Sequence, residues 1–344
     1  MNKDESFIAR CLSLAEKGKG KVSPNPMVGA VIVHNDLIIG EGYHQKYGES
    51  HAEVNAIKNV KDKSLLKHAT LYVSLEPCSH HGKTPPCCDL IIENKIPRVV
   101  IGCKDSYKEV NGKGIEKLIA SGIEVEIGVL EKKCLALNKR FFTFHEKKRP
   151  YIILKWAKSQ DGFMDRKRQN KKEGINWITQ PETKCLTHKW RAQEDAILVG
   201  KNTIINDNPS LTTRSYDGEN PLRVVLDLNK ELNKTSKLFN DNIKTIIVNN
   251  KTAEKLDHIE YVKFNKKELL HNLMQFLYKR NIQSIIIEGG KKTIETFLKE
   301  DLWDEAKVLT GETFFEDGLA APTLKKTPEH TFYFSTDRID IFKK

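Results

Sequence analysis

Short apolar runs rich in β-branched residues alternate with amphipathic segments along most of the chain. An apolar run of about four to eight residues favours a β-strand, whereas apolar residues at helical spacing favour an α-helix. Strands that alternate with helices are typical of a layered α/β protein. The sequence therefore predicts this fold class before any single residue is considered.

The alternation falls into two sets, which suits a chain of 344 residues. The first set opens with a helix at 6–17 and two strands within 27–44. Further helices are predicted at 51–60, 85–95, 114–122 and 131–145, and strands at 69–76, 98–103 and 123–130. The basic segment at 145–150, which ends in proline, predicts a boundary. We therefore expect a first domain at 1–145, a linker at 146–150 and a second domain at 151–344.

The second set is again α/β. Strands are predicted at 151–159, 196–200, 221–228, 245–250 and 283–290, helices at 268–282 and 291–302, and an extended segment at 303–315. The polar stretch 166–174 is expected to be an exposed loop, and the chain shows no tandem repeat.

Composition narrows the class of protein. Hydrophobic residues make up 39% of the chain and charged residues 30%, and no apolar run approaches the ~18 residues of a membrane span. The first residues are charged and amphipathic, without the apolar core of a secretory signal. We therefore expect a cytoplasmic protein with no membrane partner. In such a reducing compartment, the one cluster among its seven cysteines indicates metal binding or catalysis.

The formal net charge of +11 raises the possibility of nucleic-acid binding. However, the lysines are spread along the chain and are accompanied by many Asn and Ile residues. This pattern favours a solvated, lysine-rich surface, and a small phosphorylated substrate would use only a few of these charges.

Four side chains form a candidate metal site. His51, Cys78 and Cys87 supply one nitrogen and two sulfurs, the donor types that zinc prefers, and three protein ligands leave a fourth position for water. Glu53 lies two residues beyond His51 and can exchange protons with that water. The set suits a hydrolytic deaminase. A structural zinc site is the alternative, with Cys88 or His80 as a fourth protein ligand.

The motifs HAE at 51–53, EPC at 76–78 and the later Cys87 resemble the cytidine-deaminase superfamily. The eight residues between Cys78 and Cys87, with PNPMVG at 24–29, GEGYH at 40–44 and VNGKG at 110–114, resemble one branch, the deaminase domain of bifunctional riboflavin-biosynthesis deaminase-reductases. The resemblance implies that His51, Cys78 and Cys87 bind zinc and that Glu53 shuttles protons. It also implies substrate contacts for Asn25, His44, His80, Lys83 and Asp105. One departure is Tyr107, where the family usually has asparagine.

The second half resembles the reductase half of the same family, whose fold is like that of dihydrofolate reductase. The resemblance rests on KWAKSQDG at 155–162, NWIT at 176–179, KWRAQEDAILVG at 189–200, NTIINDNPSLTTR at 202–214 and IEGG at 287–290. It implies that Ala157, Trp177, Thr203, Asp207 and the segment from Gly290 line an NADP site. It also implies that Lys155, Arg191, Leu211, Arg214 and Glu288 hold the substrate. Ile175 departs from the family, which commonly has serine there.

Together the two resemblances imply a bifunctional riboflavin-biosynthesis enzyme that uses zinc and NADPH on one phosphorylated pyrimidine. The expected protein is a hydrolase and an oxidoreductase, forms a homo-oligomer and binds no nucleic acid. One alternative is an RNA-editing deaminase with a basic C-terminal binding module. Another is a degenerate protein that binds ligand without catalysis, which the complete His, Glu, Cys, Cys set argues against.

Overall fold

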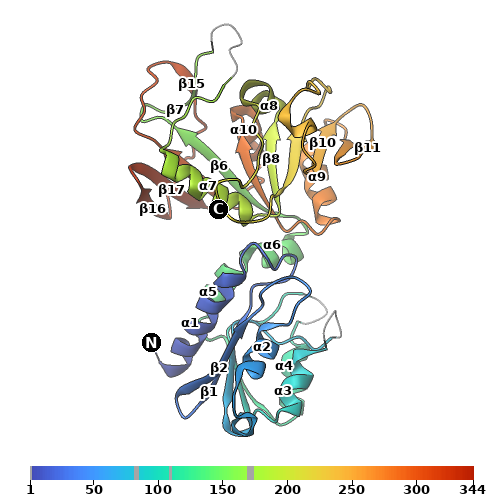
Figure 1. Cartoon of the computed structure of the whole chain (residues 1–344), viewed down its shortest axis with the longest axis vertical. Coiled ribbons are helices and arrows are strands. Elements are labelled where there is room, and N and C mark those ends of the chain that lie inside the picture. The colour runs from blue at the N-terminus through green and yellow to red at the C-terminus, as the bar shows by residue number, and fades with distance from the viewer. Residues whose placement is uncertain (1, 81–84, 108–110, 169–173) are drawn as a thin grey trace. The chain divides into compact units, whose positions relative to one another are not determined.

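The computed structural model describes residues 2–80, 85–107, 111–168 and 174–344 (Figure 1). The chain divides into two compact units, Met1–Lys148 and Arg149–Lys344. The boundary between them lies inside the segment predicted as a linker. None of the described helices combines the length and the apolar character that crossing a membrane requires.

Within its described residues, the first unit contains a five-stranded sheet in the order β2-β1-β3-β4-β5. Its strands are β1 (Gly29–His34), β2 (Leu37–Tyr43), β3 (Thr70–Val73), β4 (Arg98–Ile101) and β5 (Glu124–Ile127). β1 runs antiparallel to β2 and β3, whereas β3, β4 and β5 are parallel. Every strand predicted in this half is present, because each combines an apolar run with flanking turn residues.

Helices cover both faces of this sheet (Figure 1). The first unit has α1 (Lys3–Ala15), η1 (Glu16–Gly18), α2 (Ala52–Asn59), η2 (Lys63–His68), α3 (Cys87–Glu93), α4 (Lys113–Ala120), α5 (Glu131–Leu137) and α6 (Lys139–Lys147). Apolar residues of α2, α3 and α4 pack on one face, and those of α1, α5 and α6 pack on the other. The arrangement buries both faces, as the apolar strands require.

The prediction of a single helix at 131–145 is wrong, because α5 and α6 are separate helices that meet at Asn138. The Asn138 side chain is buried and pairs with the backbone of Met27: its Oδ1 accepts from the Met27 N–H at 2.8 Å, and its Nδ2 donates to the Met27 carbonyl at 2.9 Å. An amide that satisfies a distant backbone fixes the local chain direction. The helical pattern of the sequence carries no sign of this long-range pair.

The second unit contains, in its described part, a ten-stranded sheet in the order β11-β12-β10-β9-β8-β13-β6-β14-β17-β16. Its strands are β6 (Tyr151–Lys158), β8 (Ala196–Gly200), β9 (Leu222–Leu226), β10 (Thr245–Asn249), β11 (Glu254–Leu256), β12 (Ile259–Lys263), β13 (Ser284–Gly289), β14 (Glu305–Thr310), β16 (His330–Phe334) and β17 (Asp337–Lys343). The strands from β12 to β14 are parallel, and β11, β17 and β16 are antiparallel. A separate ribbon pairs β7 (Phe163–Arg166) with β15 (Gly318–Ala320).

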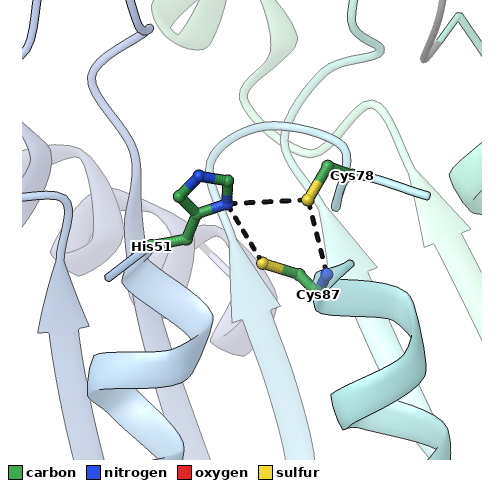
Figure 2. A group of neighbouring side chains, drawn as sticks. All are labelled: His51, Cys78 and Cys87. Atoms are coloured by element: carbon green, nitrogen blue, oxygen red, sulfur yellow. Dashed lines mark hydrogen bonds between the residues drawn. The ribbon is translucent and has the colours of Figure 1, made fainter. Parts of the chain in front are cut away.

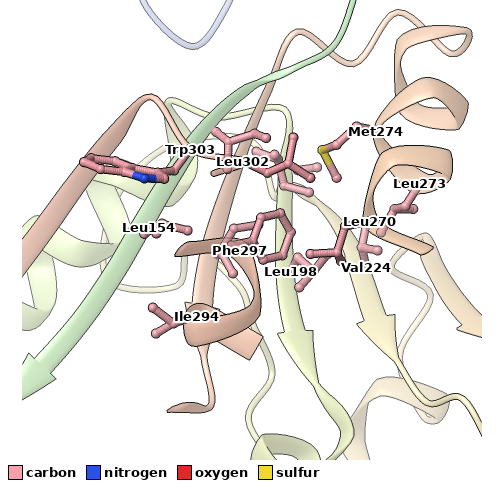
Figure 3. Packing of buried hydrophobic residues seen from close by; sticks show 14 of the residues in the cluster. Leu154, Leu198, Val224, Leu270, Leu273, Met274, Ile294, Phe297, Leu302 and Trp303 are labelled. Carbon is pink, nitrogen blue, oxygen red and sulfur yellow. The ribbon is translucent and has the colours of Figure 1, made fainter. Parts of the chain in front are cut away.

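The parallel strands of the second unit are buried on both faces. Its helices are α7 (Pro181–Ala192), α8 (Lys201–Asp207), η3 (Lys237–Phe239), α9 (Leu269–Tyr278) and α10 (Lys291–Lys299). On one face, Leu273 of α9 and Phe297 of α10 join a cluster with Leu198 of β8 (Figure 3). On the other face, Trp190 of α7 and Ile204 of α8 pack against the sheet. The continuous apolar runs that predicted these strands reflect this two-sided burial.

Candidate active sites

The first unit brings together three side chains that could hold a metal ion. Within the described residues, His51 Nδ1 and the Sγ atoms of Cys78 and Cys87 all lie within 4.8 Å of one another (Figure 2). Nδ1 is 3.3 Å from the Cys87 sulfur and 3.5 Å from the Cys78 sulfur. Tetrahedral zinc with ordinary bond lengths holds such a nitrogen and sulfur about 3.6 Å apart. The donor set therefore fits zinc in both chemistry and spacing.

Two helix starts position these ligands. His51 is the residue immediately before α2, and Cys87 is the first residue of α3, directly after Pro86. Cys78 follows β3 in the chain and accepts a hydrogen bond at its sulfur from the Cys87 backbone N–H at 3.3 Å. Hydrogen bonds from Cys87 and His51 hold the pKa of Cys78 well below its ordinary value. This environment favours the thiolate of Cys78, the form that binds a metal.

Glu53 lies in the first turn of α2 and is only 3% exposed. Burial raises the pKa of its carboxyl to about 6, which the nearby His51 partly opposes. A carboxyl group that titrates near neutrality can both take up and return a proton at working pH. Its placement beside the ligands, outside the donor set, suits a proton shuttle.

The alternative of a fourth cysteine ligand finds no support in the geometry. The Cys88 sulfur donates to the Pro77 carbonyl at 3.3 Å and to the Gly114 carbonyl at 3.6 Å, and Cys88 is not part of the donor group. His80 has a buried Nδ1 with no hydrogen-bond partner in the described part of the chain. Lys83, expected from the resemblance to contact substrate, lies outside the described residues.

Asn25 and His44 form a linked pair beside the ligands. The His44 and His51 rings pack edge to face, with their centroids 5.4 Å apart. The Nδ1 atom of His44 lies 3.1 Å from the Ser50 carbonyl oxygen. A carbonyl can only accept, so Nδ1 carries the proton and Nε2 accepts from Asn25 Nδ2 at 3.1 Å. The Asn25 amide is thereby oriented, with its carbonyl oxygen turned away from this bond.

Asp105 is buried, and burial raises the pKa of its carboxyl to about 7. Its Oδ1 accepts from the Tyr107 backbone N–H at 2.8 Å. The Tyr107 ring lies 4.9 Å from the His145 ring and 6.2 Å from the His80 ring. The residue that replaces the family's asparagine therefore adds an aromatic surface at this position.

Sequence reasoning missed the role of Glu76 in this half. Its buried carboxylate accepts hydrogen bonds from the backbone N–H groups of Asp105, Gly112, Gly114 and Ile115, at 3.0 to 3.3 Å, all within the described residues. These bonds fasten the loop that carries Asp105 and the start of α4 to the segment that leads to Cys78. A charged residue between an apolar strand and a proline was the only signal in the sequence.

In the second unit, a cavity of about 1100 Å³ lies beside the carboxyl ends of β6, β8 and β13. Ligands in open parallel sheets bind at such ends. All of the residues expected to contact cofactor or substrate in this half line the cavity: Lys155, Ala157, Trp177, Arg191, Thr203, Asp207, Leu211, Arg214, Glu288 and Gly290. Residues up to 135 positions apart in the chain thus share one site.

A buried ionic network forms part of the cavity wall. Arg191 donates from Nε and Nη2 to the Glu288 carboxylate at 2.8 and 2.7 Å, and Lys155 Nζ lies 3.8 Å from the same carboxylate. The charges of Arg191 and Lys155 outweigh burial and lower the pKa of Glu288 to about 2. Burial lowers the pKa of Lys155. Glu288 is therefore ionised, and Arg191 is already paired.

Several cavity residues were not expected from the sequence. Arg168 donates to Asp165 at 2.7 Å and to Asp207 at 2.8 Å, so it fixes a residue expected to contact the cofactor. His188 precedes Arg191 by three positions on α7, a spacing that places both on one helix face.

Trp177, which was expected to contact the cofactor, is 55% exposed, and Lys184 Nζ lies 4.4 Å from its ring centroid. Trp177 is therefore not a core residue.

Comparisons with known proteins agree with this division of sites. Residues 1–103 match the model of the cytidine and deoxycytidylate deaminase zinc-binding region, and residues 150–317 match that of the RibD C-terminal domain. The chain is 41% identical to the riboflavin biosynthesis protein RibD of Aquifex aeolicus over 323 residues, covering 92% of this chain and 89% of that protein. The RibD protein of Escherichia coli (strain K12) is 35% identical, with 88% and 86% covered.

A solved structure covers both units. The diaminohydroxyphosphoribosylaminopyrimidine deaminase/5-amino-6-(5-phosphoribosylamino)uracil reductase of Thermotoga maritima matches 99% of this chain and 98% of its own, with a TM-score of 0.89 and 37% identity. The predicted fold class is confirmed, with a cytidine-deaminase-like unit followed by a reductase unit.

Proposed function

This chain belongs to the RibD family, the bifunctional enzymes of riboflavin biosynthesis that join a zinc-binding deaminase to a reductase, and we propose a shared substrate for its two activities. The first unit deaminates 2,5-diamino-6-ribosylamino-4(3H)-pyrimidinone 5′-phosphate. The second unit reduces the ribosyl group of the product to ribityl with NADPH. The deaminase domain spans 1–145 and the reductase domain 151–344.

His51, Cys78 and Cys87 hold zinc in the proposed deaminase site. Bound there, zinc supplies a Lewis acid that lowers the pKa of water to about 7. Glu53 accepts a proton from the attacking water and delivers it to the departing amine. Its buried carboxyl, with a pKa of about 6, suits both transfers. Asn25, His44, His80, Lys83 and Asp105 position the pyrimidine nucleotide.

The cofactor-binding part of the proposed reductase site consists of Ala157, Trp177, Thr203, Asp207 and the start of α10 at Gly290. The free backbone N–H groups of a helix start favour a phosphate group of the dinucleotide. NADPH supplies the hydride, and the protein supplies placement.

In the substrate-binding part of the cavity, some charged side chains orient the ribose and another binds the phosphate. Lys155 and Glu288 orient the reacting ribose carbon, and Leu211, which lines the same cavity, contacts the substrate. Arg214 binds the phosphate. Arg191 holds Glu288 in place through their paired hydrogen bonds, so its effect on the substrate is partly indirect.

The observation that carries this proposal is the zinc-sized donor set of His51, Cys78 and Cys87 with buried Glu53 beside it. The test follows ammonia release and NADPH oxidation together, with the zinc-loaded protein and the diaminopyrimidinone ribotide. Ammonia release followed by NADPH loss supports both activities and their order. Ammonia release alone contradicts the reductase assignment, and the absence of both signals favours the RNA-editing or the degenerate alternative.

We further propose a cytoplasmic homo-oligomer that acts on small molecules and binds no nucleic acid. The competing RNA-editing function predicts deamination of an RNA substrate and no nicotinamide binding. Incubation with tRNA and with the free ribotide, each followed by ammonia release, separates the two. Release from tRNA alone contradicts the proposal.

A further inference from the structure

His188 is a buried histidine in the wall of the reductase cavity to which neither the sequence motifs nor the resemblance assigns a role. It lies near the end of α7, is 2% exposed and lines the cavity. Buried histidines in protein interiors are usually satisfied on both ring nitrogens. Among the residues that the structure describes, only one ring nitrogen of His188 has a hydrogen-bond partner.

The hydrogen bonding of His188 fixes the position of its proton. The Ser215 backbone N–H donates to His188 Nδ1 at 3.2 Å. A backbone N–H can only donate, so Nδ1 is the unprotonated nitrogen and Nε2 carries the proton of the neutral ring. Nε2 has no hydrogen-bond partner among the residues that the structure describes, and it is not one of the atoms sealed from solvent. A polar donor therefore opens on the cavity.

Burial and the neighbouring cations Arg191, Arg214 and Lys184 lower the pKa of His188 to about 4, against the opposing charge of Glu288. The ring is therefore neutral at ordinary assay pH. In this neutral tautomer Nε2 still carries its proton, so the ring presents a hydrogen-bond donor to the cavity.

The charges around His188 indicate the chemistry of its partner. Arg191 is neutralised by its paired bonds to Glu288. Arg214 and Lys184 have no carboxylate within ion-pair distance in the described ranges, and Lys184 instead lies over the Trp177 ring. Two uncompensated cations beside a neutral donor form a site for an anion, and arginine is well suited to phosphate.

We propose that the Nε2–H of His188 donates a hydrogen bond to the phosphate group of the reductase substrate, beside Arg214. This inference rests on the proposed function of the second unit and deepens it. His188 is a binding residue in this reading, because it touches substrate away from the reacting carbon. The Ser215 bond orients the ring, so the loop that carries Arg214 and the donor on α7 are set together.

The sharpest variant is His188→Asn. Asparagine can place an acceptor near the former position of Nδ1, which retains the Ser215 bond, but it lacks a donor near the position of Nε2. His188→Gln can restore a donor near Nε2. Loss of a hydrogen bond to a charged group lowers affinity by about 10-fold to 100-fold. We expect His188→Asn to raise the KM of the reductase by about 10-fold or more, with kcat little changed, and His188→Gln to recover part of the loss.

Lys189→Gln is the matched control, because Lys189 is the next residue on α7, is exposed and does not line the cavity. It should leave KM unchanged. Ammonia release by the first unit is the internal control for folding, together with the thermal unfolding of each variant. A variant that retains ammonia release and the wild-type unfolding temperature but has a raised KM supports the proposal.

The dephosphorylated substrate, 5-amino-6-ribosylaminouracil, tests which group His188 contacts. With this substrate, wild-type and His188→Asn proteins should have the same KM, because the shared partner is gone. An undiminished penalty places the contact on the ribose or base and overturns the proposal. An unchanged KM of His188→Asn with the phosphorylated substrate also overturns it.

Inorganic phosphate gives an independent readout. It should inhibit the wild-type reductase competitively with substrate, and its inhibition constant should rise several-fold in His188→Asn. If the wild-type protein fails to oxidise NADPH with the deaminated ribotide, the proposed function itself fails. If it oxidises NADPH and the His188 variants behave as wild type, only the present inference fails.

Discussion

The guanidinium of Arg191 grips the carboxylate of Glu288 through two hydrogen bonds of 2.8 and 2.7 Å, although the two residues are 97 positions apart. Both side chains are almost fully buried. The pair joins α7 to the end of β13, and Lys155 of β6 approaches the same carboxylate. Three elements of the second unit therefore depend on one ionised group in the cavity wall.

Glu288→Gln should destabilise the second unit by about 3–5 kcal/mol at pH 7, because it leaves Arg191 buried without its counter-charge. The measurement is urea unfolding followed by the tryptophan fluorescence of the second unit. Its control is Glu295→Gln, since Glu295 is exposed and pairs with Lys291 on the same helix. Equal unfolding free energies for wild type and Glu288→Gln would contradict the structural role of the pair.

The effect of Glu288→Gln on the free energy of unfolding should depend on pH. The pKa of Glu288 is lowered to about 2 in the folded protein, from an ordinary value of 4.5. A lowered carboxyl pKa stabilises the fold above the unfolded value, and the stabilisation is lost as pH falls through the folded value. The difference in unfolding free energy between wild type and Glu288→Gln should be constant from pH 7 to pH 5 and about 1–2 kcal/mol smaller at pH 3. A difference that grows towards low pH would contradict this linkage.

Glu53→Gln should retain zinc and lose deamination by about 10²-fold to 10⁴-fold, because the amide cannot take up and return a proton. Metal content by elemental analysis and ammonia release are the two readouts. NADPH oxidation with the deaminated ribotide should match wild type. Unchanged ammonia release would exclude Glu53 as the proton shuttle.

Zinc removal should separate the two activities. A chelator should abolish ammonia release and leave NADPH oxidation with the deaminated ribotide intact, since the three side chains proposed to bind zinc lie in the first unit. Added zinc should restore ammonia release to wild type but not to Cys87→Ser, which lacks one thiolate ligand. Loss of both activities on chelation would contradict this assignment.

Arg214→Ala should raise the KM of the reductase by about 10-fold to 100-fold, because it removes a charged donor from the phosphate. Ammonia release should be unchanged. Lys279→Ala is the charge control, because Lys279 is exposed at the end of α9 and does not line the cavity. A fall in ammonia release in Arg214→Ala alone would contradict the division of tasks between the units.

Gly42→Ala should destabilise the first unit by about 1–3 kcal/mol and weaken zinc binding. An added Cβ at this position of β2 would lie 2.5 Å from the Ala56 backbone nitrogen and 2.8 Å from the Ala52 carbonyl oxygen, both in α2. Relief of that clash must move α2, which His51 precedes directly. Urea unfolding and a zinc titration check the result against Leu37→Ala at the exposed end of β2. Wild-type zinc affinity in Gly42→Ala would contradict the link between this packing and the metal site.

The fold class and the buried strands could be read from the sequence, because a strand buried on both faces needs a continuous apolar run. The strands β8, β10 and β13 are examples. In contrast, β16 is exposed along its whole length and no such run predicts it. The break between α5 and α6 was also missed, because Asn138 ends the helix by pairing with Met27, 111 residues earlier. Local periodicity carries no information about such a partner.

For the sites, the sequence by itself determined which side chains are available, because zinc chemistry demands specific donor types such as His51, Cys78 and Cys87. Only the tertiary structure decided the state and partner of each group. Burial raises the pKa of the Glu53 carboxyl to about 6, and Glu288 forms an ion pair with Arg191. The hydrogen bond from Ser215 leaves the Nε2–H of His188 facing the cavity. These properties depend on solvent exclusion and on contacts between distant segments, and both arise only when the chain is folded.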